Sequence, residues 1–101
     1  MNLTDKRILI TGGNGFVGRH LIQRLLERGI PKENLFIPKH TEFDFRRWED
    51  CEKAVEGQDL VIHLAAKVGG IGLNKERPGE LFYDNLIMGA HLMEAARQAG
   101  V

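Results

Sequence analysis

The chain has 101 residues, of which 43% are hydrophobic and 28% charged, and its formal net charge at neutral pH is zero. This length suits one globular domain, and the balanced charge argues against nucleic acid or an anionic membrane as the main partner. No apolar run reaches the roughly 18 residues of a membrane span, and the lone cysteine, Cys51, can form no internal disulfide and has no metal-ligand pattern around it, so a cytoplasmic location is the simplest expectation.

Strands and helices are expected to alternate in the first half of the chain. Residues 7–11 form a short β-branched run that ends in a glycine cluster, which predicts a buried strand. Residues 16–28 predict a helix closed by Gly29, with one apolar face made of Val17, Leu21, Ile22, Leu25 and Leu26. Residues 34–38 predict a second strand stopped by proline. Residues 42–45 alternate polar and apolar side chains, which indicates a short edge strand.

The second half continues the alternation. Residues 48–55 predict a helix ending at Gly57, and residues 59–65 form the strongest strand pattern in the chain. A glycine-rich loop over 67–72 follows. Pro78 suits the first position of a long helix that runs to about Gln98 and is closed by Gly100. Alternating strands and helices imply parallel strands joined by right-handed crossovers, which is the α/β class with helices on both faces of the sheet.

Three glycines lie between the first strand and the first helix, at the spacing Gly-x-x-Gly-x-x-Gly. Gly12 allows a sharp turn, Gly15 lets the backbone approach a phosphate, and Gly18 allows close packing of the helix. The free N–H groups and the dipole of the helix start then favour a pyrophosphate. A tight turn without a ligand is the alternative. The pattern predicts a Rossmann-type dinucleotide site formed by Gly12, Gly13, Asn14, Gly15, Phe16, Val17 and Gly18.

The residues after the second strand favour NADP over NAD. An acidic residue here would bind the 2′-hydroxyl of NAD, but the sequence is Pro38-Lys39-His40, with no carboxylate before Glu42. Lys39 could pair with a 2′-phosphate, or it could be a solvated surface lysine. If the turn is displaced by one residue, His40 is the second candidate.

The chain resembles the extended short-chain dehydrogenase/reductase family, also described as NAD-dependent epimerases/dehydratases, and within it most closely the GDP-L-fucose synthase group. Residues 11–18 carry the general likeness. The more specific likeness lies in residues 63–71, followed by Asn74, Pro78 and Asn85 at family-like spacing. The resemblance implies a cofactor of NADP, a nucleotide-sugar substrate for the full-length relative, and a chain that is the N-terminal part, residues 1–101, of an NAD(P)-binding Rossmann domain.

The resemblance also implies roles for single residues. Asp44 would accept a hydrogen bond from the adenine amino group, with Phe45 beside the ring, although Asp44 could instead cap the following helix. The cofactor's ribose and pyrophosphate side would be lined by Leu64, Ala65 and Ala66, and Lys67 would begin the segment facing the nicotinamide and sugar. His63 is expected to be a packed core histidine. Asn85 is expected to orient backbone near the loop.

The catalytic residues of that family have no counterpart in these 101 residues. The family uses a Ser/Thr and a Tyr-x-x-x-Lys motif, whereas the one tyrosine, Tyr83, is followed four residues later by Ile87. Cys51 precedes the sugar-binding region and cannot be the family's catalytic cysteine. We therefore expect a cofactor-binding segment without a catalytic half or substrate domain. The alternatives are a stand-alone dinucleotide-binding module and a truncated product without function.

A homodimer is also expected. In the family's sheet order the second strand and residues 59–65 flank the first strand, so the edge of residues 59–65 is left uncovered by this chain. Such an edge is a template for pairing with another chain. The last helix adds an apolar surface over Leu81, Leu86, Ile87, Ala90, Met93, Ala95, Ala96 and Ala99, and the matching helix of the family contributes to a dimer interface.

Overall fold

Three parallel strands form the sheet of the computed structural model, which describes residues 2–66 and 76–101. The helices and strands follow in the order β1 (Ile8–Thr11), α1 (Phe16–Glu27), the short 3₁₀ helix η1 (Lys32–Asn34), β2 (Leu35–Phe36), α2 (Trp48–Val55), β3 (Leu60–His63) and α4 (Pro78–Ala99). The strand order is β2-β1-β3, with Ile8 opposite both Leu35 and Leu60. The predicted α/β class and the predicted placement of the flanking strands are therefore confirmed.

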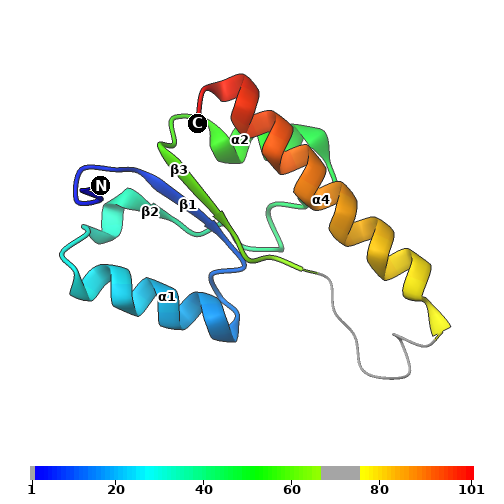
Figure 1. The fold of residues 1–101 in the computed structure, drawn as a ribbon, viewed down its shortest axis with the longest axis horizontal. Coiled ribbons are helices and arrows are strands. Elements are labelled where there is room, and N and C mark those ends of the chain that lie inside the picture. The colour runs from blue at the N-terminus through cyan, green and yellow to red at the C-terminus, as the bar shows by residue number, and fades with distance from the viewer. Residues whose placement is uncertain (1, 67–75) are drawn as a thin grey trace.

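Helices cover both faces of the sheet, with α1 on one side and α2 and α4 on the other (Figure 1). Side chains alternate along β1, so this strand packs against the helices on both faces of the sheet. Ile8 and Ile10 pack with Leu25 of α1, whereas Leu9 packs with residues of α2 and α4. All four residues of β1 are buried, as expected for the central strand of a sheet covered on both faces.

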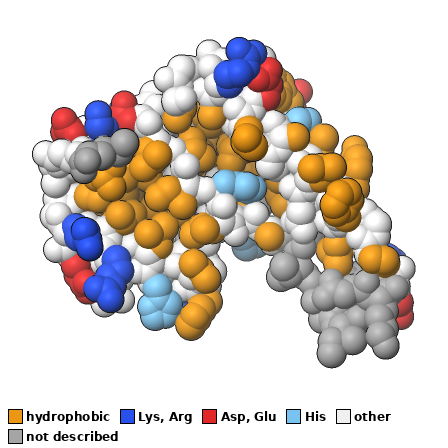
Figure 2. Space-filling model, in the orientation of Figure 1, with side chains coloured by type: hydrophobic (Ala, Val, Ile, Leu, Met, Phe, Trp, Pro, Cys, Tyr) orange, Lys and Arg blue, Asp and Glu red, His pale blue; other side chains and the backbone are white. Residues whose placement is uncertain are grey.

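The long helix α4 begins and ends where the sequence predicted. Pro78 occupies its first turn, and Gly100 closes it in the left-handed region at φ 81°. Its inner face is buried through Leu81, Met88, Leu92 and Ala95, which recur at helical spacing. Its outer face leaves large apolar side chains exposed, namely Phe82, Tyr83, Leu86 and Met93. Figure 2 shows hydrophobic side chains gathered along this helix.

Residues 42–45 do not form the predicted edge strand. The backbone here is a loop that begins with a turn, in which the N–H groups of Glu42 and Phe43 both donate to the carbonyl oxygen of Lys39. The alternation seen in the sequence has another cause: Phe43 and Phe45 stack with ring centroids 6.3 Å apart, and Phe45 is buried in the core beneath α2 and α4. Tertiary packing, and not strand pairing, places these two rings on one side.

The observed exposure of single side chains corrects other expectations from the sequence. Val17 and Leu26, predicted on the apolar face of α1, are exposed at 62% and 40%. His63 is exposed and is not a packed core histidine.

Cys51 is fully buried, and its thiol donates to the carbonyl of Phe45 at 3.2 Å. Burial raises the pKa of this thiol to about 11.

The predicted glycine-rich loop over 67–72 lies outside the described residues. In the ranges 2–66 and 76–101, no helix is both long enough and apolar enough to span a bilayer.

Candidate functional site

The turn between β1 and α1 depends on the absence of side chains at Gly12 and Gly18. Gly12 has φ +72°, and a Cβ there would lie 2.7 Å from the backbone of Leu64 and Ala65. A Cβ on Gly18 would lie 2.3 Å from the carbonyl oxygen of Gly12. Gly18 therefore permits close packing of α1 on the glycine turn itself, a more local role than the predicted packing of the helix against the sheet.

Gly15 begins helix α1 and leaves its positive end open. The N–H of Gly15 donates to the carbonyl of Gly12 at 3.1 Å, and its own carbonyl accepts from Arg19 at 2.9 Å. Among the described residues no side chain caps this end, and the first turn carries no acidic residue. The first N–H groups of a helix have no intrahelical acceptor, so this end attracts an anion.

Thr11 ties the end of β1 to the segment that leaves β3. Its buried hydroxyl oxygen lies 3.1 Å from the backbone nitrogens of both Leu64 and Ala65, which donate to it. The same oxygen lies 2.6 Å from Nδ1 of His63, and partial desolvation of that ring lowers the pKa of His63. The segment 64–65 is thereby fixed opposite the glycine turn.

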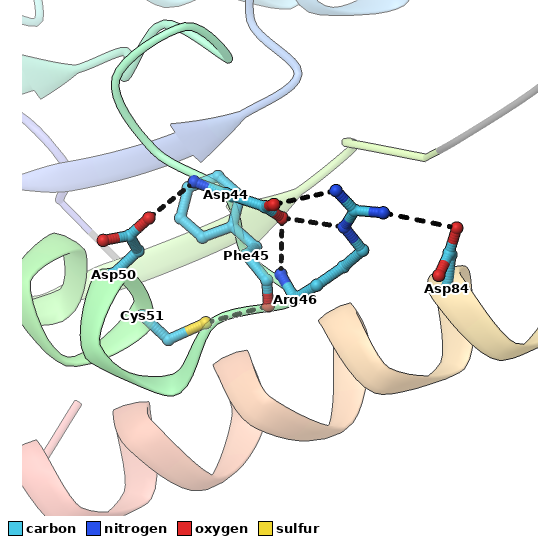
Figure 3. Close-up of polar contacts among 6 residues, drawn as sticks. All are labelled: Asp44, Phe45, Arg46, Asp50, Cys51 and Asp84. Carbon is cyan, nitrogen blue, oxygen red and sulfur yellow. Dashed lines mark hydrogen bonds and ion pairs between the residues drawn. The ribbon is translucent and has the colours of Figure 1, made fainter.

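Asp44 and Arg46 form a closed pair on the loop before α2 (Figure 3). The Arg46 guanidinium donates to Oδ1 of Asp44 at 3.0 Å and to Oδ2 at 2.8 Å, and it lies 3.6 Å from the carboxylate of Asp84 on α4. The side-chain hydrogen bond from Arg46 lowers the pKa of Asp44. Asp44 does not cap α2. Its Oδ1 accepts from the backbone N–H of Arg46, which closes a local turn.

These elements line an open cavity of about 740 Å³, a volume in the usual range for small-molecule sites. It lies beyond the carboxyl ends of the strands, where the chain passes from β1 to strands on either side of it. Open α/β sheets bind ligands at such a switch point. The lining consists of Gly12, Asn14, Gly15, Pro38, His40, Phe43, Asp44, Phe45, Arg46, Leu64, Ala65, Ala66 and Met88.

Nine of the residues predicted from the sequence line this cavity, among them Gly12, His40 and Asp44. Five others do not: Gly13, Phe16, Val17, Gly18 and Lys39. Lys67 lies outside the described residues. Sequence reasoning missed Pro38, Phe43, Arg46 and Met88. Arg46 could have been suspected from its place two residues after Asp44, whereas Met88 comes from α4 and its position in the apolar stripe carries no sign of the cavity.

This sheet, with its glycine turn and its cavity at the switch point, defines a Rossmann-type α/β protein. Residues 8–101 match the model of the NAD dependent epimerase/dehydratase family, and the chain belongs to that family.

Curated relatives are about one-third identical to this chain over the aligned residues. It is 36% identical over 101 residues to a GDP-L-fucose synthase of Sinorhizobium fredii, covering 98% of this chain and 31% of the relative. It is 33% identical over 107 residues to GDP-mannose 3,5-epimerase 1 of Oryza sativa subsp. japonica, covering 94% of this chain and 28% of the relative. The chain thus spans less than a third of the length of either.

Solved structures show the same fold. A UDP-glucose 4-epimerase of Thermus thermophilus in complex with NAD matches with a TM-score of 0.71 and 36% identity, over 94% of this chain and 35% of that one. A GDP-L-fucose synthetase of Naegleria fowleri bound to NADP matches with a TM-score of 0.73 and 27% identity, over 97% of this chain and 29% of that one.

Proposed function

We propose that this chain binds the adenosine and pyrophosphate part of a nicotinamide dinucleotide, as the cofactor-holding segment of a nucleotide-sugar epimerase or reductase. The observation that carries the proposal is the cavity that has the open end of α1 and Gly15 on one wall and Asp44 on another. A phosphate suits the first wall and an adenine amino group suits the second. Titration of the chain with NADP and NAD in a calorimeter tests it.

The proposal extends to a preference for NADP. His40 lines the cavity and can donate a hydrogen bond to a 2′-phosphate, and Lys39, beside it, is exposed and can pair with the charge of that phosphate. Replacing both with alanine should reduce NADP affinity towards that for NAD. Lys32→Ala, at the opposite end of β2, removes an exposed lysine from outside the cavity and is the control. Wild-type protein that binds NAD as tightly as NADP would contradict the preference.

We expect no catalytic turnover from these 101 residues alone. They contain no Tyr-x-x-x-Lys motif, since Ile87 stands four residues after Tyr83, and a positioned acid/base is needed for proton transfer beside the nicotinamide. An assay of NADPH oxidation with GDP-keto-sugar should therefore stay at background. Turnover that survives rigorous purification would contradict this part of the proposal.

The proposal also includes association of two copies of the chain. Among the described residues β3 pairs with β1 alone, and a groove of about 510 Å³ runs beside it, lined in part by Leu60, Val61 and Met93. Leu86, exposed at 58%, lies on the same helix as Met93. Light scattering after size exclusion should show a dimer that Leu86→Glu weakens. Leu26→Glu, on the exposed side of α1, is the matched control, and a stable wild-type monomer at micromolar concentration would refute the dimer.

A further inference from the structure

We propose that Arg46 is a positioning residue that orients the Asp44 carboxylate and thereby makes the cavity selective for adenine over bases that lack an exocyclic amino group. The inference rests on the proposed dinucleotide site and identifies what sets its base preference. It assigns Arg46 no direct bond to the base.

The hydrogen bonds among the described residues leave the Asp44 carboxylate a single acceptor site for a ligand. An ionised carboxylate offers about four lone-pair sites on its two oxygens. Oδ1 accepts from the backbone N–H and from Nε of Arg46, each at 3.0 Å, and Oδ2 accepts from Nη2 at 2.8 Å. Two sites on Oδ1 and one on Oδ2 are therefore taken. The remaining site is on Oδ2, and its direction is fixed because the planar guanidinium holds both oxygens at once.

The loop that carries Asp44 is fixed from several sides. The backbone N–H of Asp44 donates to Oδ2 of Asp50 at 2.8 Å, and the carbonyl of Phe45 accepts from the buried thiol of Cys51. Arg46 reaches across to α4, where its Nη1 lies 3.6 Å from Oδ2 of the buried Asp84 (Figure 3). The guanidinium thus joins the loop to a helix of the core, so its orientation does not depend on the loop alone.

The Arg46–Asp44 pair is partly exposed, so its main effect is to orient the Asp44 carboxylate and not to stabilise the fold. The side chains of Arg46 and Asp44 are 45% and 38% exposed, and ion pairs at such positions contribute little to folding. An Asp44 carboxylate without Arg46 would be free to turn towards solvent. The loss should therefore appear in the discrimination between bases and not mainly in thermal stability.

The test compares two ligands that differ at one group of the base, NADP and nicotinamide hypoxanthine dinucleotide phosphate. Hypoxanthine has a carbonyl oxygen in place of the amino group, so at that position of the base it presents an acceptor to Asp44 and not a donor, and its nearest donor is the ring N1–H, one position away. Wild-type protein should prefer NADP by about tenfold, as expected for a hydrogen bond to a charged acceptor. Arg46→Gln should reduce that ratio to about threefold or less. Arg47→Gln is the control, because it removes the same charge from the next residue and the Arg47 side chain makes no hydrogen bond to Asp44. This variant should leave the ratio of the two affinities unchanged.

Two further variants separate orientation from charge. Arg46→Lys keeps the positive charge but lacks the planar fork, and should restore only part of the ratio. Asp44→Asn replaces an acceptor by a group that can donate to the hypoxanthine oxygen, and should lower or reverse the preference. Circular dichroism and melting temperature are measured for each variant. If Arg46→Gln does not fold, the ratio of NADP affinity to hypoxanthine-dinucleotide affinity measured for Arg46→Lys tests the role of Arg46 instead.

The outcomes distinguish this inference from the function on which it rests. Wild-type protein that binds neither dinucleotide contradicts the proposed function, and the role of Arg46 with it. Wild-type protein that binds both ligands equally, or an Arg46→Gln ratio equal to that of wild type, overturns the role of Arg46 and leaves dinucleotide binding intact.

Discussion

The hydroxyl oxygen of Thr11 lies 2.6 Å from Nδ1 of His63, at the point where β1 and β3 end side by side. The same oxygen accepts the N–H groups of Leu64 and Ala65, so its own proton is directed to the histidine. Nδ1 is then an acceptor, and the ring is the neutral tautomer with its proton on Nε2. This pair fixes the cavity wall that lies against Gly12.

Thr11→Val should destabilise the fold and weaken ligand binding together. The methyl group cannot accept from Ala65, whereas the N–H of Leu64 keeps the backbone carbonyl of Thr11 as an acceptor at 3.0 Å. An unsatisfied backbone N–H costs about 2 kcal/mol. Urea denaturation should show that loss in the free energy of unfolding. Thr11→Ser retains the hydroxyl and is the control. A Thr11→Val protein as stable as Thr11→Ser would show that the hydroxyl network does not hold this wall.

His63 should make stability depend on pH in weakly acidic solution. Desolvation lowers its pKa in the folded state from the ordinary value of 6.5, so the unfolded chain binds more protons as the pH falls through 6.5. The contribution of the neutral ring is complete above 6.5 and is lost as the pH falls towards the folded pKa. Asn in place of His63 keeps an acceptor near Thr11 but does not titrate. The difference in unfolding free energy between wild type and His63→Asn should therefore fall between pH 7.5 and 5, and a constant difference would contradict the assignment.

Two helical glycines should respond in opposite directions to alanine. At Gly18 a Cβ would meet the carbonyl oxygen of Gly12 at 2.3 Å, so Gly18→Ala must displace the glycine turn and should destabilise the protein. At Gly89, in the middle of α4, a Cβ would meet none of the described part of the chain within 4 Å, and alanine should stabilise the helix by about 0.5–1 kcal/mol. Chemical denaturation of both variants gives the comparison. Stabilisation by Gly18→Ala would exclude the close contact described for the turn.

The parts of the fold that depend on local chemistry could be predicted from the sequence. Glycine spacing and the apolar runs located β1, α1 and β3, and Pro78 with Gly100 marked the ends of α4. The loop over 42–45 could not be predicted, because the alternation of Phe43 and Phe45 reflects burial against helices that come later in the chain.

The candidate site also has parts that could be predicted from the sequence and parts that could not. The glycine turn is a local motif, so its place in the cavity was predictable. Arg46 could be suspected from its place two residues after Asp44, but its contact with Asp84, a residue 38 positions further on, follows from no spacing rule. The exposure of His63 was also mispredicted, because the apolar strand pattern favoured a buried side chain, whereas this residue is the last of β3, a strand that pairs on one side alone among the described residues.

The central claim is that the glycine turn holds the pyrophosphate of a dinucleotide, and titration calorimetry with NADP tests it most directly. Gly15 has ordinary backbone angles, and among the described residues a Cβ there would meet only the carbonyl of Gly12, at 3.3 Å, so a side chain would project mainly into the cavity. Wild-type protein should bind NADP, Gly15→Val should lose at least about tenfold in affinity, and Gly89→Val on α4 should bind as wild type does. Absence of binding by wild type, or undiminished binding by a folded Gly15→Val protein, would contradict the account.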